Sequence, residues 1–388
     1  MLIFRAKSKK TLVVTFLSIL AVIALLSIST ISHGIPYFAR KYDFQCNTCH
    51  VIPPKLNQFG EGFRANGYRL PEIYPTNRTW PFALWITERG ELEHSKDFEK
   101  TFPNRVEVIS GGPIGEKFSY FVEWRVVSLE TESNGDLRDR SGRFEDLFIN
   151  YEFIKPFTLR VGQYRLLNQV DDSLKLGLST PVVIGTSIAG DPSSNPRKTS
   201  LRSFAPANRS PAIGLGYHTI KGENSADGWF NIISLPFPGE FSIPLTDEAR
   251  DEASFEFEFD PKGVFFESFY RWGLSSIGAN LFVDDDRSTG SVLGVYNIGP
   301  LFSTIGFGYG RESGDTSFRF SWENEFIPIR FFSVGARVDH RSDLDNGTAF
   351  VPNINIQWPL TKWTLRLVLE QRVQVDNHAT LAELSVVF

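Results

Sequence analysis

The sequence predicts a mainly β protein: a transmembrane antiparallel β-barrel of about 16 strands with a short N-terminal segment inside its lumen. Three observations lead to this. Apolar and polar residues alternate in many stretches after about residue 81. Aromatic residues make up 14% of the chain, with 35 Phe against one Met. The last strand ends in an aromatic residue, Phe388.

The beginning of the chain predicts export. Residues 5–10 hold four basic residues, and an uncharged stretch rich in Leu, Ile and Val covers residues 11–30. This order is typical of a secretory signal peptide, and small residues before Ile35 allow cleavage there. We therefore expect residues 1–34 to be a cleavable signal peptide. Because the apolar run is long, an uncleaved membrane anchor is the competing interpretation.

The charge balance argues against nucleic acid as a partner. The chain has 40 basic and 45 acidic residues, a net charge of −5. Cleavage would remove four basic and no acidic residues, so the net charge would fall to −9. An acidic protein is repelled by phosphate backbones, whereas metal cations and basic proteins are plausible partners.

The only two cysteines lie in the motif Cys46-Asn-Thr-Cys49-His50. This spacing is typical of covalent attachment of one haem c, in which both sulfurs bind the porphyrin and the histidine binds the iron. A disulfide or thioredoxin-like pair is disfavoured, because no alternating strand and helix pattern surrounds the motif. Zinc is disfavoured because no second Cys or His cluster lies nearby. Cys46, Cys49 and His50 are therefore the predicted haem-binding residues.

The neighbours of His50 bear on how its ring is held and what else binds the iron. A backbone carbonyl at Pro53 or Pro54 could accept the second imidazole N–H, although these prolines could equally serve only to turn the chain. The single methionine is Met1, which excludes His/Met ligation after cleavage and leaves bis-histidine ligation, an unusual ligand or an open position. Of the other histidines, His94 is the nearest in sequence and the first candidate for a distal ligand; the remaining ones are His218, His340 and His378.

Several segments show the alternation of β-strands. Ser254–Asp260 alternates Phe with acidic residues, and residues 318–323 and 364–370 alternate aromatic or Leu residues with polar ones. Short runs separate the strands as hairpin turns would: Lys155-Pro156, Asp260–Gly263, Gly299-Pro300 and Pro359–Lys362. The long polar stretches 166–210 and 235–250 are expected to be loops on the outer side of a bacterial barrel.

Alternation alone does not separate a soluble sandwich from a membrane barrel. The strands are numerous and long, the chain ends as outer-membrane barrels do, and aromatics cluster at strand ends, as with Trp80, Trp229, Trp358 and Trp363. Our count gives roughly 17 strands, but both termini should lie in the periplasm, so an even number of about 16 is expected. The expected organisation is a haem segment at 35–80, too short to fold alone, and a barrel at 81–388.

The N-terminal region resembles a known family. Pro36–Arg40, the motif Cys46–His50, Pro54–Gly60 and Phe63–Tyr68 look like the opening of the fused monohaem cytochrome–porins, which include the outer-membrane iron oxidases of iron-oxidising bacteria. The resemblance covers residues 35–70. It implies a cytochrome plug inside an outer-membrane barrel, which takes electrons from extracellular Fe(II) and passes them to a periplasmic c-type cytochrome.

Three functions follow as hypotheses. The first is extracellular electron transfer, with Fe(II) oxidation as its most specific form; the second is a solute porin whose haem is structural or senses redox state; the third is an outward electron conduit to an extracellular acceptor. Acidic runs at 247–252 and 284–286 could attract cations, although charged loop tips are normally only solvated. No nucleophile motif or phosphate loop stands in the sequence, which disfavours a hydrolase or a transferase.

Overall fold

A computed structural model describes most of the chain after residue 35. The described residues are 36–70, 81–92, 103–131, 137–171, 174–184, 209–219, 226–239, 241, 243, 260–285, 287–312, 315–344, 346–359, 364–375 and 377–387. The expected signal peptide, His94, Trp80, Trp363, Phe388, the acidic run at 247–252 and most of Ser254–Asp260 lie outside them. Within the described part, no helix is long and apolar enough to cross a membrane.

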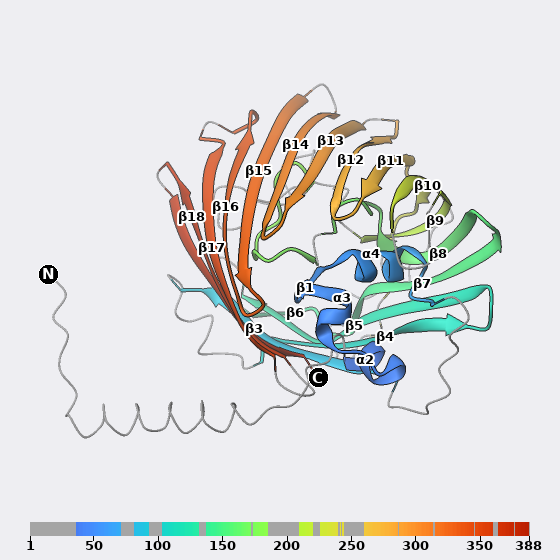
Figure 1. The fold of residues 1–388 in the computed structure, drawn as a ribbon. Coiled ribbons are helices and arrows are strands. Elements are labelled where there is room, and N and C mark those ends of the chain that lie inside the picture. The colour runs from blue at the N-terminus through green and yellow to red at the C-terminus, as the bar shows by residue number, and fades with distance from the viewer. Residues whose placement is uncertain are drawn as a thin grey trace, which may run out of the picture.

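The N-terminal segment, residues 36–70, consists of short elements. Helix α2 (Pro36–Tyr42) is followed by α3 (Cys46–Cys49), the two-stranded hairpin of β1 (His50–Ile52) and β2 (Lys55–Leu56), and α4 (Gln58–Ala65). Asn57 begins α4, since its side-chain oxygen accepts a hydrogen bond from the amide of Gly60 at 2.9 Å. Figure 1 shows these elements within the ring of barrel strands.

The rest of the described chain forms a closed antiparallel barrel. Seventeen strands follow one another, and sixteen of them build the wall, because β6 pairs only with the end of β5 while β5 and β7 pair directly. The strands are β3 (Ala83–Glu91), β4 (Arg105–Ile114), β5 (Phe118–Thr131), β6 (Leu137–Asp139), β7 (Arg143–Ile154), β8 (Phe157–Arg165), β9 (Arg209–His218), β10 (Gly228–Pro236), β11 (Val264–Trp272), β12 (Ser275–Val283), β13 (Arg287–Ile298), β14 (Leu301–Glu312), β15 (Asp315–Ile329), β16 (Phe332–Arg341), β17 (Thr348–Pro359), β18 (Thr364–Gln374) and β19 (Asn377–Val387).

Closure occurs where the last strand meets the first. β19 pairs with β3 from Leu381–Glu91 to Val387–Trp85, so the described wall has no open sheet edge. The prediction of a mainly β, antiparallel barrel of about 16 strands is confirmed.

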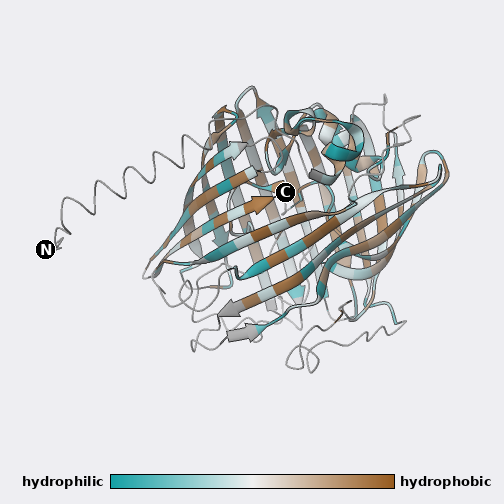
Figure 2. Cartoon of the chain, turned by 90° about the horizontal axis from the view of Figure 1, so that it is seen from below, coloured by the Kyte–Doolittle hydropathy of each residue, from teal (hydrophilic) through white to brown (hydrophobic). Residues whose placement is uncertain are grey.

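The two faces of the wall have opposite polarity. On β15, Arg319, Ser321 and Glu323 are buried toward the lumen, whereas Phe318 and Trp322 are 44% and 47% exposed on the outside. This is the reverse of a water-soluble sandwich, in which the apolar face is the buried one. Figure 2 shows the resulting hydrophobic and hydrophilic bands along the strands. The alternation read from the sequence therefore indicates a barrel whose outer surface suits lipid.

The two ends of the barrel differ. At the end where β3 begins and β19 ends, which we call the terminal mouth, the connections are mostly short, as at Lys155-Pro156 and Gly299-Pro300. The opposite end, the loop mouth, carries the long connections after β8 and β10. Asp260–Gly263 is not a hairpin turn, as the sequence suggested, but the end of the long connection that precedes β11. This asymmetry is the one expected of a bacterial outer-membrane barrel.

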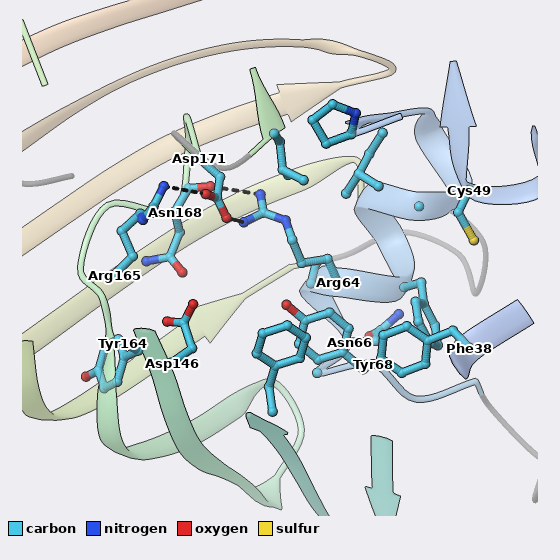
Figure 3. Close-up of a pocket in the computed structure, with 18 of the residues that line it drawn as sticks. Phe38, Cys49, Arg64, Asn66, Tyr68, Asp146, Tyr164, Arg165, Asn168 and Asp171 are labelled. Atoms are coloured by element: carbon cyan, nitrogen blue, oxygen red, sulfur yellow. Dashed lines mark hydrogen bonds and ion pairs between the residues drawn. The ribbon is translucent and has the colours of Figure 1, made fainter. Parts of the chain in front are cut away.

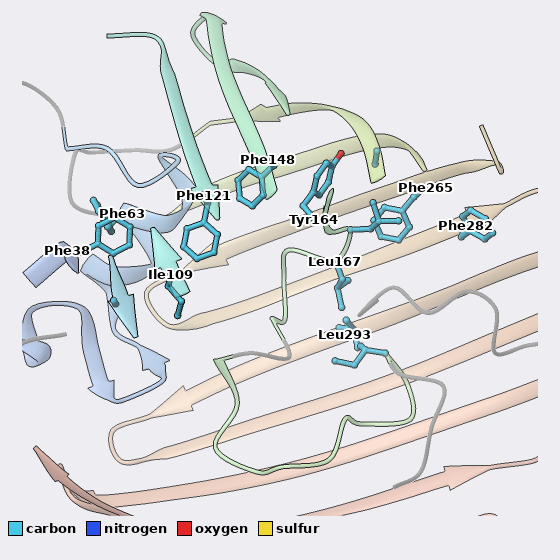
Figure 4. Close-up of a cluster of buried hydrophobic side chains, with 14 of the residues drawn as sticks. Phe38, Phe63, Ile109, Phe121, Phe148, Tyr164, Leu167, Phe265, Phe282 and Leu293 are labelled. Carbon is cyan, nitrogen blue, oxygen red and sulfur yellow. The ribbon is translucent and has the colours of Figure 1, made fainter. Parts of the chain in front are cut away.

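One long connection does not stay outside. The inward loop, which we define as the described residues between 166 and 184, turns into the lumen. Leu166, Leu176 and Val182 are at most 1% exposed, and Figure 4 shows the loop crossing between the wall strands. The prediction that 166–210 is an outer loop is therefore wrong for this part. The polar composition of this loop suggested that it lies in solvent. Its backbone amides instead donate hydrogen bonds to carboxylates on the wall strands.

Candidate functional site

The site is built around the haem motif in the N-terminal segment. Cys46 and Cys49 occupy the two ends of the single turn α3, and His50 begins β1 directly after it. Cys46 is 6% exposed and His50 is 9% exposed, while Cys49 is half-buried. The two cysteines form no disulfide with each other. The structure thus brings together the three residues that the sequence predicts as haem-binding.

Two contacts hold this turn against α4. The side-chain amide of Asn57 donates to the carbonyl oxygens of Asn47 and Thr48 at 2.9 and 3.0 Å. Gly60 lies so close to α3 that a Cβ placed on it would stand 2.1 Å from the Cys49 carbonyl oxygen. Only glycine permits this approach of two backbones. The sequence Asn57-Gln-Phe-Gly60 therefore fixes the position of the motif.

The His50 ring is oriented by a backbone carbonyl. Its Nδ1 lies 3.0 Å from the carbonyl oxygen of Pro54, the partner that the sequence suggested. Burial lowers the pKa of His50 to about 4, although hydrogen bonds to the Pro54 and Lys55 backbone act in the opposite direction. A neutral ring that donates through Nδ1 leaves Nε2 with a lone pair, the form in which histidine binds a metal.

The Cys49 thiol has low nucleophilic reactivity in its buried environment. Burial, together with the neighbouring Cys46, raises the pKa of the Cys49 thiol to about 12. The thiol is then protonated at neutral pH, so it does not favour a nucleophilic or redox-active role for the pair.

Cys49 and His50 line a large cavity between the N-terminal segment and the wall (Figure 3). On the segment side, Phe38, Phe63 and Tyr68 contribute aromatic rings. Phe38 stacks on Tyr68 with ring centroids 5.4 Å apart, and Tyr68 stacks on Phe121 of β5 at 4.7 Å. These rings join the short segment to the wall and supply the apolar core that 35 residues lack alone.

Charged contacts tie the same segment to the lumen. Arg64 of α4 lies 3.0 Å from Glu61 and 3.3 Å from Asp171 of the inward loop. Glu61 in turn lies 2.9 Å from Arg271 of β11. Burial raises the pKa of Glu61, but the Arg271 and Arg64 guanidinium groups outweigh it and hold this pKa below its usual value. Glu61 and Asp171 therefore serve as structural counter-ions. The sequence did not reveal this role, because the Arg64–Asp171 and Arg271–Glu61 pairs join residues over 100 positions apart.

The other histidines lie in different places. His94 is outside the described residues. His340 and His378 stand near the loop-mouth ends of β16 and β19. His218, the last residue of β9, lies at the terminal mouth and lines the cavity with His50. Nothing in the sequence distinguishes His218 as a candidate ligand.

The acidic run at 284–286 has an ordinary partner. Asp284 lies 2.5 Å from Arg287 in the turn between β12 and β13. It therefore supports the solvated or locally paired interpretation rather than a cation site.

The residues present fit a haem c. One helical turn offers two thiols, the next residue is an imidazole held by a carbonyl, and an aromatic cavity adjoins them. A haem needs each of these: two attachment points, an oriented ligand and an apolar environment. Cys46 and Cys49 would hold the macrocycle, and His50 its iron.

Comparisons with known proteins concern the barrel. No protein-family model and no curated protein matches the chain. Solved structures with a similar architecture include an OmpF of Salmonella typhi in complex with daunomycin (TM-score 0.46, 9% identity) and an anion-selective porin from Comamonas acidovorans (0.43, 12%). An outer membrane protein of Vibrio cholerae, an OmpT with loop L8 deleted, matches with a TM-score of 0.41 and 8% sequence identity. Each match covers 79% of this chain and 97% of the other. They say nothing about the N-terminal segment's chemistry.

Proposed function

We propose that this chain is an outer-membrane barrel that carries one covalently attached haem c in its lumen and transfers electrons across the membrane. The observation that carries the proposal is the arrangement of Cys46, Cys49 and His50 beside a cavity inside the barrel. When bound, the haem would supply one-electron redox chemistry. The chain's own residues bind it, orient its iron ligand and surround it with aromatic rings.

The surface of the wall supports the location. Large apolar side chains are exposed along the strands, among them Val292 at 54% and Tyr296 at 55%. A continuous apolar exterior is unfavourable in water and favourable in lipid, and a closed barrel leaves no backbone edge to satisfy. The expected signal peptide would bring the chain to the compartment where haem c is attached and the outer membrane is assembled.

The direction of electron flow follows from the resemblance to the cytochrome–porins. That resemblance implies one-electron oxidation of extracellular Fe(II) to Fe(III), with a periplasmic c-type cytochrome as the electron acceptor; a haem held by Cys46, Cys49 and His50 would supply the one-electron redox chemistry between them. The N-terminal segment sits at the terminal mouth, the periplasmic end of a bacterial barrel, where such a partner could approach. An outward conduit would use the same parts in the reverse direction.

A solute porin is the second candidate, and the barrel architecture favours it. Barrels of about sixteen strands enclose an aqueous lumen in porins, and the described wall of this chain has sixteen strands. In this chain both the inward loop and the N-terminal segment occupy the lumen. A haem would then be structural or redox-sensing.

Two measurements separate the candidates. Purified, haem-loaded protein is mixed anaerobically with Fe(II), and the reduced haem bands are followed; we expect reduction, and its absence would overturn Fe(II) oxidation. A Cys46→Ser, Cys49→Ser double variant is the control, because it retains the barrel but has no attachment point. Liposomes containing either protein are then tested for swelling in small sugars. Rapid swelling with the haem-loaded protein would favour the porin instead.

A further inference from the structure

We propose that His218 is the second axial ligand of the haem iron; this inference rests on the proposed haem attachment. Methionine cannot supply a second iron ligand in the exported chain, because Met1 is the only methionine and lies in the expected signal peptide. The described histidines other than His50 are His218, His340 and His378. Their places in the barrel select one of them.

Two of the three point away from the lumen. On β16 the buried lumenal residues are Asp339 and Arg341, so His340 between them faces outward, where its Nδ1 lies 2.9 Å from the Thr348 hydroxyl. His378 precedes the buried Ala379 and is exposed. Both also stand at the loop mouth, whereas the haem motif stands at the terminal mouth. Neither can meet a haem attached to Cys46 and Cys49.

His218 has the opposite orientation. Its neighbours Leu215 and Tyr217 are 43% and 37% exposed on the outer face, so the alternation of β9 turns His218 inward. There it lines the same cavity as Cys49 and His50. Its ring lies 6.1 Å from that of Phe230, which packs against it from β10.

The His218 ring has an unfulfilled polar atom. Its Nδ1 is buried and has no hydrogen-bond partner among the described residues. A buried nitrogen without a partner is unfavourable, so such groups in native proteins usually have a ligand, a water molecule or an ion as partner. His340 shows the contrast, because its Nδ1 is engaged.

The residue before His218 on the inner face of β9 is Gly216, which lines the cavity. A Cβ at Gly216 would meet nothing closer than the Thr158 carbonyl oxygen at 3.6 Å. The inward-facing position before it, Gly214, is covered by the Tyr164 side chain. A glycine inside a strand often marks a place where a ligand or another backbone approaches closely. The inner face of β9 therefore presents the His218 imidazole beside one open position, Gly216.

The test compares His218→Ala with His378→Ala, the matched histidine at the other mouth. All proteins are first assayed for covalent haem by mass and by the haem spectrum after denaturation. The ferric proteins are then examined by electron paramagnetic resonance and visible absorption. We expect low-spin haem in the wild type and His378→Ala, loss of the low-spin signal in His218→Ala, and its return when imidazole is added.

The outcomes separate the two proposals. Wild-type protein without covalent haem would overturn the proposed function. Covalent haem that is high-spin in the wild type, or that stays low-spin in His218→Ala, would overturn the role of His218 alone. The His218→Met variant keeps the test decisive if His218→Ala does not fold. We expect it to remain low-spin with a raised reduction potential, because His/Met ligation raises the potential, and an unchanged potential would overturn the ligand role.

Discussion

The N-terminal segment and the inward loop both lie in the lumen, but they contact the wall in different ways. The segment uses side chains: Arg69 lies 2.6 Å from Glu152, and Lys55 pairs with Glu325. The inward loop uses its backbone: Glu370 accepts hydrogen bonds from the amides of Leu178 and Ser179 at 2.7 and 2.9 Å. Buried backbone groups must be satisfied even where no regular structure does so.

Because of this difference, we expect the sequence of the inward loop to tolerate more substitutions than the sequence of the N-terminal segment. A segment that docks through side chains depends on its own sequence, so its motif can be recognised. A loop that docks through backbone amides depends on the residues that receive it, and many loop sequences would satisfy the same wall. In the described residues, the carboxylates of Glu267 and Glu370 each accept two loop amides. The wall carboxylates therefore carry part of the information for this fold, together with buried loop side chains such as Leu166 and Leu176.

The largest effect is expected where the wall holds the loop. Glu370→Ala would leave two buried amides without acceptors, at about 1–3 kcal/mol for each donor. We expect the amides of Leu178 and Ser179 to exchange hydrogen much faster, whereas Glu370→Gln, which keeps one acceptor oxygen, should lose about half as much protection. Gln371→Ala, on the exposed face of the same strand, is the control. Equal hydrogen exchange of these amides in all variants would mean that the position of the loop does not depend on Glu370.

The next effect concerns the turn that carries the motif. Gly60→Ala places a Cβ 2.1 Å from the Cys49 carbonyl oxygen, a backbone atom that cannot rotate away. We expect α4 to move from α3, a destabilisation of the segment by about 1–3 kcal/mol, and a smaller fraction of chains with covalent haem by mass. Gly294→Ala is the matched control, since its Cβ would meet Ile305 at an ordinary 3.5 Å. An unchanged haem fraction in Gly60→Ala would contradict the role of this contact.

The barrel and the motif could be predicted from the sequence because both are local signals. Alternation on β15 and the spacing of Cys46, Cys49 and His50 need no distant partner to be recognised. The inward loop and the Arg64–Asp171 pair could not, because each depends on residues brought together only by barrel closure. His218 was one of four candidate histidines, behind His94, and only the structure shows that it lies on the inward face of β9. Gly214 and Gly216 lie on the same face of β9 as His218. The sequence alone does not say which face of this strand points into the lumen.

A smaller effect should link the two lumenal regions directly. Arg64 of the segment lies 3.3 Å from Asp171 of the inward loop and also donates to the Asn168 carbonyl oxygen at 3.0 Å. We expect a double-mutant cycle of Arg64→Ala and Asp171→Ala, read by hydrogen exchange of α4, to give a coupling of about 0.5–3 kcal/mol. Asp284→Ala, which removes an ion-pair partner at the loop mouth, should leave α4 unchanged. Additive effects would show that the two regions dock independently.

The smallest effect tests whether the segment docks through ring contacts as well as charges. Tyr68 and Phe121 stack with centroids 4.7 Å apart and planes at 18°. We expect Tyr68→Leu and Phe121→Leu, which keep apolar bulk, to show a coupling of about 0.5–1.5 kcal/mol in the exchange of α4.

The same strand offers the matched control for that pair. Phe118 stacks on Tyr151 at 4.5 Å and 14°, but Phe118 is 43% exposed on the outer face of β5, three residues from Phe121. Leucine at Phe118 and Tyr151 should change the unfolding of the barrel while the exchange of α4 stays as it was. If substitutions in the outer pair changed the hydrogen exchange of α4 as much as those in the inner pair, the effect on the segment would come from a general loss of barrel stability. If only the inner pair does so, the rings of Tyr68 and Phe121 anchor the segment, and the position of the haem motif depends on them.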